Sequence, residues 1–414
     1  MRAPRPSGDD TSAHRRNSTR RAAAWGIFAV VLAGLNLRPG IVAVAPLVSD
    51  IRTDLGIGAG PVGMLTAIPL ACFALVSPFV PLASRRWGVE RVIAVSLAVL
   101  AGALAARALP SVPALLLATL VVGISTAVGN VLVPTAVKQW FPDRLGTATG
   151  LYSVALFTGA ALAGALTTPI AQLMPGGWRA SLGSWALLAA LALPVWWVTA
   201  ARSAQPVATG TWPATSVWRQ PVAWSVTGYM GLQSFHYFTV AAWLPEMLIS
   251  AGHSPAAAGV VLGVCNGVAM LAALLVPVVA ARRTGQGVVG VALAAASAAG
   301  LGAVLLLPGA PAVTAILLGV GQGGAIGLAL LLVVLRGGSP THTAALSGMS
   351  QSAGYLLAAT GAPLLGVIHD ATGTWSWSVA VLLGCLAAQA CSAWAAGRPR
   401  TLTASPICSG KALS

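Results

Sequence analysis

The chain has 414 residues, of which only 7% are charged and 57% are apolar, and its mean hydropathy is +0.84. A soluble globular domain carries about 25% charged residues, so this composition excludes an ordinary soluble fold and indicates a chain that spans a bilayer. The 47 Gly and 27 Pro favour closely packed, hinged helices over the alternating strands of a membrane barrel. We therefore predict an all-α polytopic membrane protein.

Basic residues outnumber acidic ones by 23 to 8, which gives a formal charge of +15. They occur singly or in pairs between apolar runs, as expected for cytoplasmic loops, so the predicted partner is the lipid bilayer and not a nucleic acid. The five cysteines have no CxxC spacing and no neighbouring His cluster. The sequence therefore predicts neither a metal site nor a cofactor.

Twelve apolar segments are long enough to cross a membrane when the chain is divided at its charges and turn residues. In chain order they cover Trp25–Val48, Gly60–Ala83, Arg91–Ala108, Pro113–Val137, Leu145–Leu173, Ala180–Ala200, Pro221–Ile249, Pro255–Ala281, Gly287–Leu307, Ala312–Leu335, Thr343–Ile368 and Trp375–Ala396.

The loop charges predict the orientation of these segments. If both termini are cytoplasmic, only Arg52, Arg107 and Arg179 fall in outer loops, as the positive-inside rule requires. We expect a multi-pass protein of the cytoplasmic membrane with a disordered cytoplasmic N-tail over 1–24 and a cytoplasmic C-tail over 397–414.

Sequence landmarks recur after 196 to 199 positions. Gly56 to Gly63 is matched by Gly252 to Gly259, and Pro46 is matched by Pro245. The repeat predicts two pseudo-symmetric six-helix bundles, 25–200 and 221–396, joined by a cytoplasmic linker over 201–220. Parallel halves of this kind occur in transporters that work by alternating access.

Arg38 is a cation about halfway along the first apolar segment, where an unpaired charge costs several kcal/mol. Two interpretations stay open. Pro39 and Gly40 can break the helix, and Arg38 could bind the carbonyls freed by that break. Alternatively, Arg38 faces a water-filled cavity and binds an anionic or polar solute through its planar fork, with Asn36 beside it.

The repeat places Arg38 opposite residues 234–237 of the seventh segment. Gln233 and His236 share one helical face there, while Tyr237 points aside. His236 could titrate near neutral pH or simply be a hydrogen-bonded packing residue. We predict that Gln233 and His236 complete the site from the second half.

Further polar side chains within the segments are weaker candidates, since polar residues also join helices to one another. They are Asn130, Tyr152, Asn266, Gln322, Gln351 and Tyr355. No HExxH, GxSxG or phosphate-binding GK[ST] motif occurs, so the chain is not predicted to be an enzyme.

The segment from Leu82 to Arg91 resembles the loop that follows the second helix in the major facilitator superfamily. Asn36-Leu37-Arg38-Pro39 and Gly231-Leu232-Gln233-Ser234 resemble the cyanate and nitroimidazole permease branch of that family. The resemblance implies a conformational loop formed by Arg85, Arg86, Gly88 and Arg91, although Arg85 stands where the family usually has an acidic residue.

The resemblance also implies a function. We expect a monomeric secondary transporter for a small anionic or polar solute that is cyanate-like or nitroheteroaromatic. A proton-coupled exporter of drugs or natural products is the alternative of the same fold, and a non-transporting membrane sensor is a more distant one.

Overall fold

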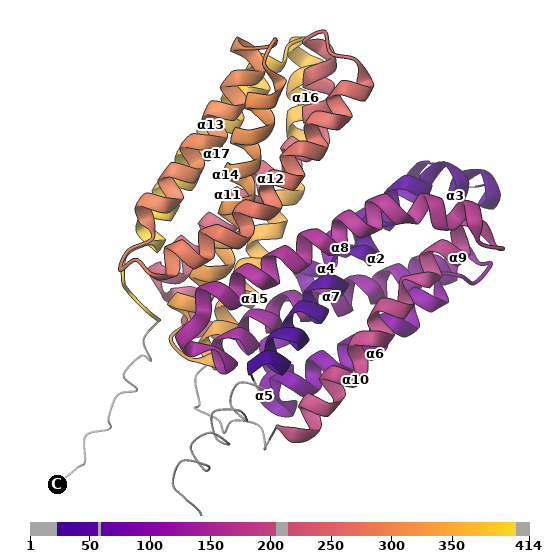
Figure 1. The fold of residues 1–414 in the computed structure, drawn as a ribbon, viewed down its shortest axis with the longest axis vertical. Coiled ribbons are helices and arrows are strands. Elements are labelled where there is room, and N and C mark those ends of the chain that lie inside the picture. Colours follow the sequence, from indigo (N-terminus) through magenta and orange to yellow (C-terminus); the bar gives the residue numbers. More distant parts are fainter. Residues whose placement is uncertain (1–22, 57–58, 204–213, 403–414) are drawn as a thin grey trace, which may run out of the picture.

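The computed structural model describes residues 23–56, 59–203 and 214–402. The predictions for most of the two tails and for half of the linker fall on the remaining residues and lie outside this description. Within the described ranges every regular element is a helix, and Figure 1 shows them gathered into two bundles. The predicted all-α fold class is confirmed.

The first bundle begins with a helix over 23–36, which has no label in Figure 1. It continues with α2 (Pro39–Val42), η1 (Ala45–Leu47), α3 (Val48–Leu55), α4 (Ala59–Val76), α5 (Val80–Trp87), α6 (Val89–Ala106), α7 (Val112–Trp140), η2 (Pro142–Arg144), α8 (Leu145–Leu173), α9 (Gly177–Ser184) and α10 (Ala186–Arg202).

The second bundle follows η3 (Ala214–Arg219). It consists of α11 (Pro221–Ser250), α12 (Pro255–Ala281), α13 (Gly287–Leu306), α14 (Pro311–Arg336), α15 (Pro340–Ala359), α16 (Gly361–Thr372) and α17 (Trp375–Ala396).

Each of the twelve predicted segments is helical, but several of them are divided into shorter helices. Ten helical stretches of the described chain are long and apolar enough to cross a membrane, and a pair bent by 61° at residues 77–79 makes an eleventh. Pro78 explains that bend, because proline has no N–H to continue the helix and disfavours helical backbone before it. The remaining segment, α11, is 30 residues long but more polar.

Helix contacts within the two bundles correspond to one another. α4 packs on α7 as α12 packs on α14, and α6 packs on α7 and α10 as α13 packs on α14 and α17. The correspondence does not extend to the helix breaks. The first segment is broken after residue 36 whereas α11 is continuous, α4 and α5 form a bent pair whereas α12 is continuous, and α8 is continuous whereas α15 and α16 are separate helices. The break in the first segment is the one that lies beside Arg38.

The two bundles touch at one end of the molecule and splay apart toward α3, α9 and α16 (Figure 1). α8 packs on α12, and α15 packs on α4, α5 and α7. Glycines allow the approach. A Cβ on Gly150 of α8 would lie 2.6 Å from the Leu274 carbonyl oxygen, and one on Gly348 of α15 would lie 2.7 Å from that of Ser77. We call this end the closed face and the opposite end the open face.

We predict that Gly150→Val separates α8 from α12 at the closed face, because a β-branched side chain has no room against the Leu274 backbone. Overpacking of this kind costs about 1–3 kcal/mol. Spin labels at the exposed Arg144 and Arg282 in a cysteine-free chain should report a longer, broader distance distribution.

Gly164→Val is the matched control, since Gly164 lies on the same helix and a Cβ there would meet no atom within 4 Å. An unchanged distance distribution in the Gly150 variant would show that this contact does not hold the bundles together.

Candidate substrate site

Arg38 lies at the break in the first segment. The helix over 23–36 ends before it, residues 37 and 38 form a turn, and α2 begins at Pro39. Pro39 has no N–H, so the carbonyl of Leu35 loses its helical donor. Gly159 of α8 lies so close to this carbonyl that a Cβ there would be 2.3 Å from its oxygen. The predicted break is therefore present, and it leaves the Arg38 side chain partly exposed.

The Arg38 side chain reaches into the second bundle. Its Nη2 donates to the hydroxyl of Tyr355 in α15 across 3.4 Å. The hydroxyls of Tyr237 and Tyr152 also lie within electrostatic range of the guanidinium. Three of the four tyrosines of the chain therefore interact electrostatically with this one cation, and Tyr355 does so through a hydrogen bond.

Aromatic rings extend from Tyr355 and Tyr237 into a connected cluster. The ring of Tyr355 lies 4.8 Å from Phe73 and 6.1 Å from Phe238, measured between centroids. Tyr237 contacts Phe238 at 5.3 Å and Phe157 at 6.3 Å. We call the set the aromatic cage; it comprises Phe73, Tyr152 and Phe157 of the first bundle and Tyr237, Phe238 and Tyr355 of the second.

No carboxylate within the described ranges pairs with Arg38. The ion pairs found there join Arg179 to Asp54 and His369 to Asp370, both toward the open face. Glu90 accepts a hydrogen bond from the Trp140 indole instead. The charge of Arg38 therefore has a phenolic hydroxyl and not a carboxylate as its hydrogen-bond partner in the described chain, a setting that suits an electron-rich solute.

The seventh segment presents a different face from the one predicted. Gln233 and His236 are both 2% exposed, and Tyr237, expected to point aside, contacts Phe157 of the other bundle. Gln233 donates to the Ser234 hydroxyl at 2.7 Å, while His236 Nε2 has no partner. Tyr237 therefore reaches the other bundle from a face different from the one that Gln233 and His236 share.

Asn36 and Asn130 have their amides bound to backbone. Asn36 donates to the carbonyls of Leu32 and, at 3.2 Å, Leu188 of α10, so it joins the first helix to α10. Asn130 is 2% exposed and donates to the Thr126 carbonyl of its own helix. Of the predicted site residues, the structure brings Arg38 and Tyr355 into direct contact.

Arg107 is a second cation near the break. The loop charges predict an outer-loop position for Arg107, yet its side chain is 0% exposed. Its guanidinium donates to the Gly40 carbonyl and to the Thr119 hydroxyl. The sequence did contain a sign that Arg107 is buried, because this residue lies inside the predicted third segment. Nothing in the sequence indicated which groups it binds.

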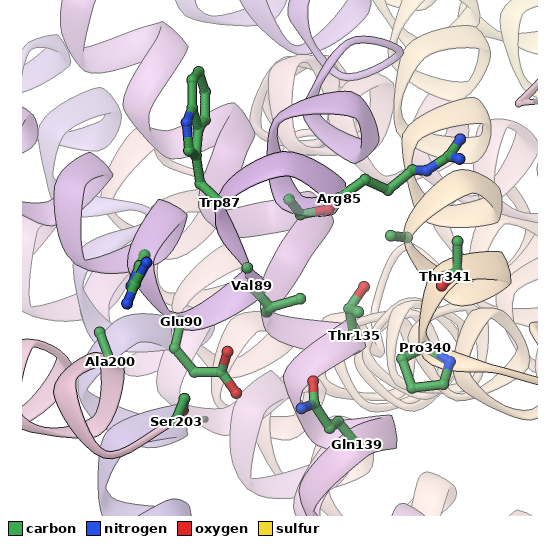
Figure 2. Close-up of a pocket in the computed structure, with 14 residues that line it drawn as sticks. Arg85, Trp87, Val89, Glu90, Thr135, Gln139, Ala200, Ser203, Pro340 and Thr341 are labelled. Atoms are coloured by element: carbon green, nitrogen blue, oxygen red, sulfur yellow. The ribbon is translucent and has the colours of Figure 1, made fainter. Parts of the chain in front are cut away.

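The predicted conformational loop lies at the closed face. Gly88 has a φ of +85°, a conformation that favours glycine, and it turns the chain from α5 into α6. Figure 2 shows a pocket there, with Glu90, Thr135 and Gln139 pointing into it and Arg85 extending toward the segment of Pro340 and Thr341. Arg91 also lines the pocket, and the Arg86 guanidinium lies 5.6 Å from the Trp87 ring centroid. The loop therefore faces the start of α15.

In the part of the chain that the structure describes, no three His, Cys, Asp or Glu side chains lie close enough together to bind a metal ion.

Comparison with known proteins gives close relatives in sequence. The chain is 37% identical to the uncharacterized transporter YycB of Bacillus subtilis over 380 residues, covering 91% of this chain and 94% of that one. It is 36% identical to the 2-nitroimidazole transporter of Escherichia coli (84% and 89% covered) and 29% identical to the cyanate transport protein CynX of that organism (84% and 91% covered).

Solved structures share the fold at low sequence identity. The proton:xylose symporter XylE superposes with a TM-score of 0.70 at 14% identity, covering 93% of this chain and 98% of that one. FucP in the outward conformation gives a TM-score of 0.69 at 12% identity, with 88% and 97% covered. The family model described as Major Facilitator Superfamily matches residues 24–359. The chain therefore belongs to the major facilitator superfamily of transporters.

Proposed function

We propose that this transporter carries a planar, polar heteroaromatic solute, of the nitroimidazole kind, through a central site formed by Arg38 and the aromatic cage. The observation that carries the proposal is that Arg38 donates to Tyr355, whose ring belongs to a cluster of aromatic side chains contributed by both bundles. A nitro group accepts hydrogen bonds in the plane of its ring, and the ring itself stacks on aromatic faces.

Composition makes this clustering informative. The chain has only seven Phe and four Tyr, yet six of these side chains belong to the cage. A linear anion such as cyanate needs a cation and hydrogen-bond donors but gains little from stacked rings. The relative named as a 2-nitroimidazole transporter is also more similar to this chain than the one named for cyanate.

Membrane electrostatics favour a neutral solute. An inside-negative potential opposes the entry of a monovalent anion by about 2.3 kcal/mol per 100 mV. A neutral nitroheteroaromatic avoids this cost. It therefore needs no coupling ion to enter, in keeping with a site whose described residues place no carboxylate beside Arg38.

Alternating access would proceed by rocking of the two bundles. The cage takes three rings from each bundle, so movement of one bundle against the other opens or closes it around the solute. We infer that the closed face is cytoplasmic, since Arg85, Arg91, Arg144 and Arg282 lie there. The structure then corresponds to an outward-facing state.

Arg38→Ala should reduce 2-nitroimidazole uptake into proteoliposomes about tenfold or more, because a hydrogen bond from a charged group contributes about 1.5–3 kcal/mol. Arg38→Lys should retain part of the uptake, since it keeps the charge and loses the planar fork. The melting temperature should change little when the removed charge faces water. An Arg38→Ala protein that melts far lower, or that transports normally, would place the site elsewhere.

Phe238→Leu should raise the KM for 2-nitroimidazole about three- to tenfold, in line with about 0.5–1.5 kcal/mol per aromatic contact. Cyanate uptake should not change. Phe235→Leu is the control on the same helix, because Phe235 is buried in the apolar core of the second bundle. Robust cyanate uptake that does not depend on Phe238, with no uptake of 2-nitroimidazole, would favour the cyanate-like alternative.

Reporter fusions test the orientation. Alkaline phosphatase, which is active only outside the cytoplasmic membrane, should be inactive when fused after Ser414 or within residues 201–220. Activity at either position would reverse the topology.

A further inference from the structure

The break that exposes Arg38 leaves a very short helix beside it. α2 has four residues, from Pro39 to Val42, and a single helical turn is not stable by itself. Its backbone is tied to Arg38, because the Arg38 carbonyl accepts from the N–H groups of Ile41 and Val42 at 3.0 Å. Any movement of α2 therefore moves the backbone from which the Arg38 side chain extends.

Arg107 connects this short helix to a long one. From the end of α6 its Nη1 donates to the Gly40 carbonyl in α2, and its Nη2 donates to the Thr119 hydroxyl in α7 at 3.1 Å. Thr119 in turn donates to the Leu115 carbonyl at 2.8 Å. α7 has 29 residues and packs on α4 and α6, so it is a rigid support.

A buried arginine such as Arg107 is energetically unfavourable at an ordinary contact between helices. Its side chain is 0% exposed, and neither ion pair of the described chain involves it. Burying an unpaired guanidinium costs several kcal/mol, which a neutral side chain would avoid. The last carbonyls of a helix lack internal donors, and a guanidinium can bind such a carbonyl and a neighbouring hydroxyl together.

We propose that Arg107 is a positioning residue for the substrate site, holding α2 against α7 so that Arg38 stays directed at Tyr355. This rests on the proposed role of Arg38 as the solute-binding cation. Arg107 itself is enclosed within the first bundle and does not touch the solute. It acts through the backbone of residues 38–42.

The first measurement needs no substrate. Phenylglyoxal modifies exposed arginines, and peptide mass spectrometry gives its rate at Arg38, which is partly exposed, separately from Arg107, which is buried. In Arg107→Met and Arg107→Lys the Arg38 rate should rise several-fold, because the Arg38–Tyr355 contact loosens. Thr119→Val should give a smaller rise, since it removes only one of the two acceptors.

Arg179→Met is the matched control. Arg179 also joins elements of the first bundle, through Asp54, but it does not touch the break. In Arg179→Met, phenylglyoxal should modify Arg38 at the same rate as in the wild type. If Arg107→Met fails to fold, the Lys and Thr119→Val variants still decide the question. Wild-type Arg38 rates in both of those variants would overturn the proposal.

The second measurement is 2-nitroimidazole uptake. Arg107→Lys should raise the KM about tenfold, equivalent to 1.4 kcal/mol, while the maximal rate stays nearly unchanged. Adding Tyr355→Phe to Arg107→Lys should change the KM less than Tyr355→Phe does in the wild type, because both act on one arrangement. Fully additive effects would contradict the proposal. If wild-type protein does not transport 2-nitroimidazole, the proposed substrate fails while the phenylglyoxal result still tests Arg107.

Discussion

An arginine at membrane depth without a carboxylate partner is the constraint around which this site is organised. In hydrocarbon such a cation costs several kcal/mol unless it reaches water, a hydrogen-bond acceptor or an aromatic face. The described structure supplies the hydroxyl of Tyr355 at 3.4 Å, two further tyrosines in electrostatic range, and a partly exposed position at a helix break. The charge remains uncompensated by any fixed anion there, and this leaves Arg38 available to a solute.

The sequence left two roles open for Arg38, which were to bind the carbonyls freed at the helix break or to bind a solute. In the structure a second arginine, Arg107, binds a carbonyl at the break. A helix interrupted by Pro39 and Gly40 has carbonyls without donors, and Arg38 was one candidate to bind them. Arg107 binds the Gly40 carbonyl instead, and the Arg38 side chain is directed across to the other bundle. Buried Arg107 satisfies the backbone at the break, while Arg38 faces the cage.

The two bundles repeat their internal contacts yet contribute unequally to the centre. α4 with α7 matches α12 with α14, so one packing scheme builds both halves. The first segment is broken at the centre, and α11, its counterpart, is continuous and carries Tyr237 and Phe238. One bundle therefore provides the cation and the other provides its hydroxyl acceptor. The proposed site is complete only when the bundles are close together, and in the proposed transport cycle this links solute binding to the movement of the halves.

The sequence by itself determined the helical segments, the repeat and the position of Arg38 within an apolar run. These features are local: apolar length, proline and glycine positions, and the cost of a charge within an apolar run. Only the tertiary structure decided which faces meet. It turned Tyr237 toward Phe157, brought Phe73 and Tyr355 together over more than 250 residues, and enclosed Arg107 against Gly40. Such contacts depend on how helices rotate and cross when they pack, and that is set by the shapes of all neighbouring side chains together, which no spacing along a single helix records.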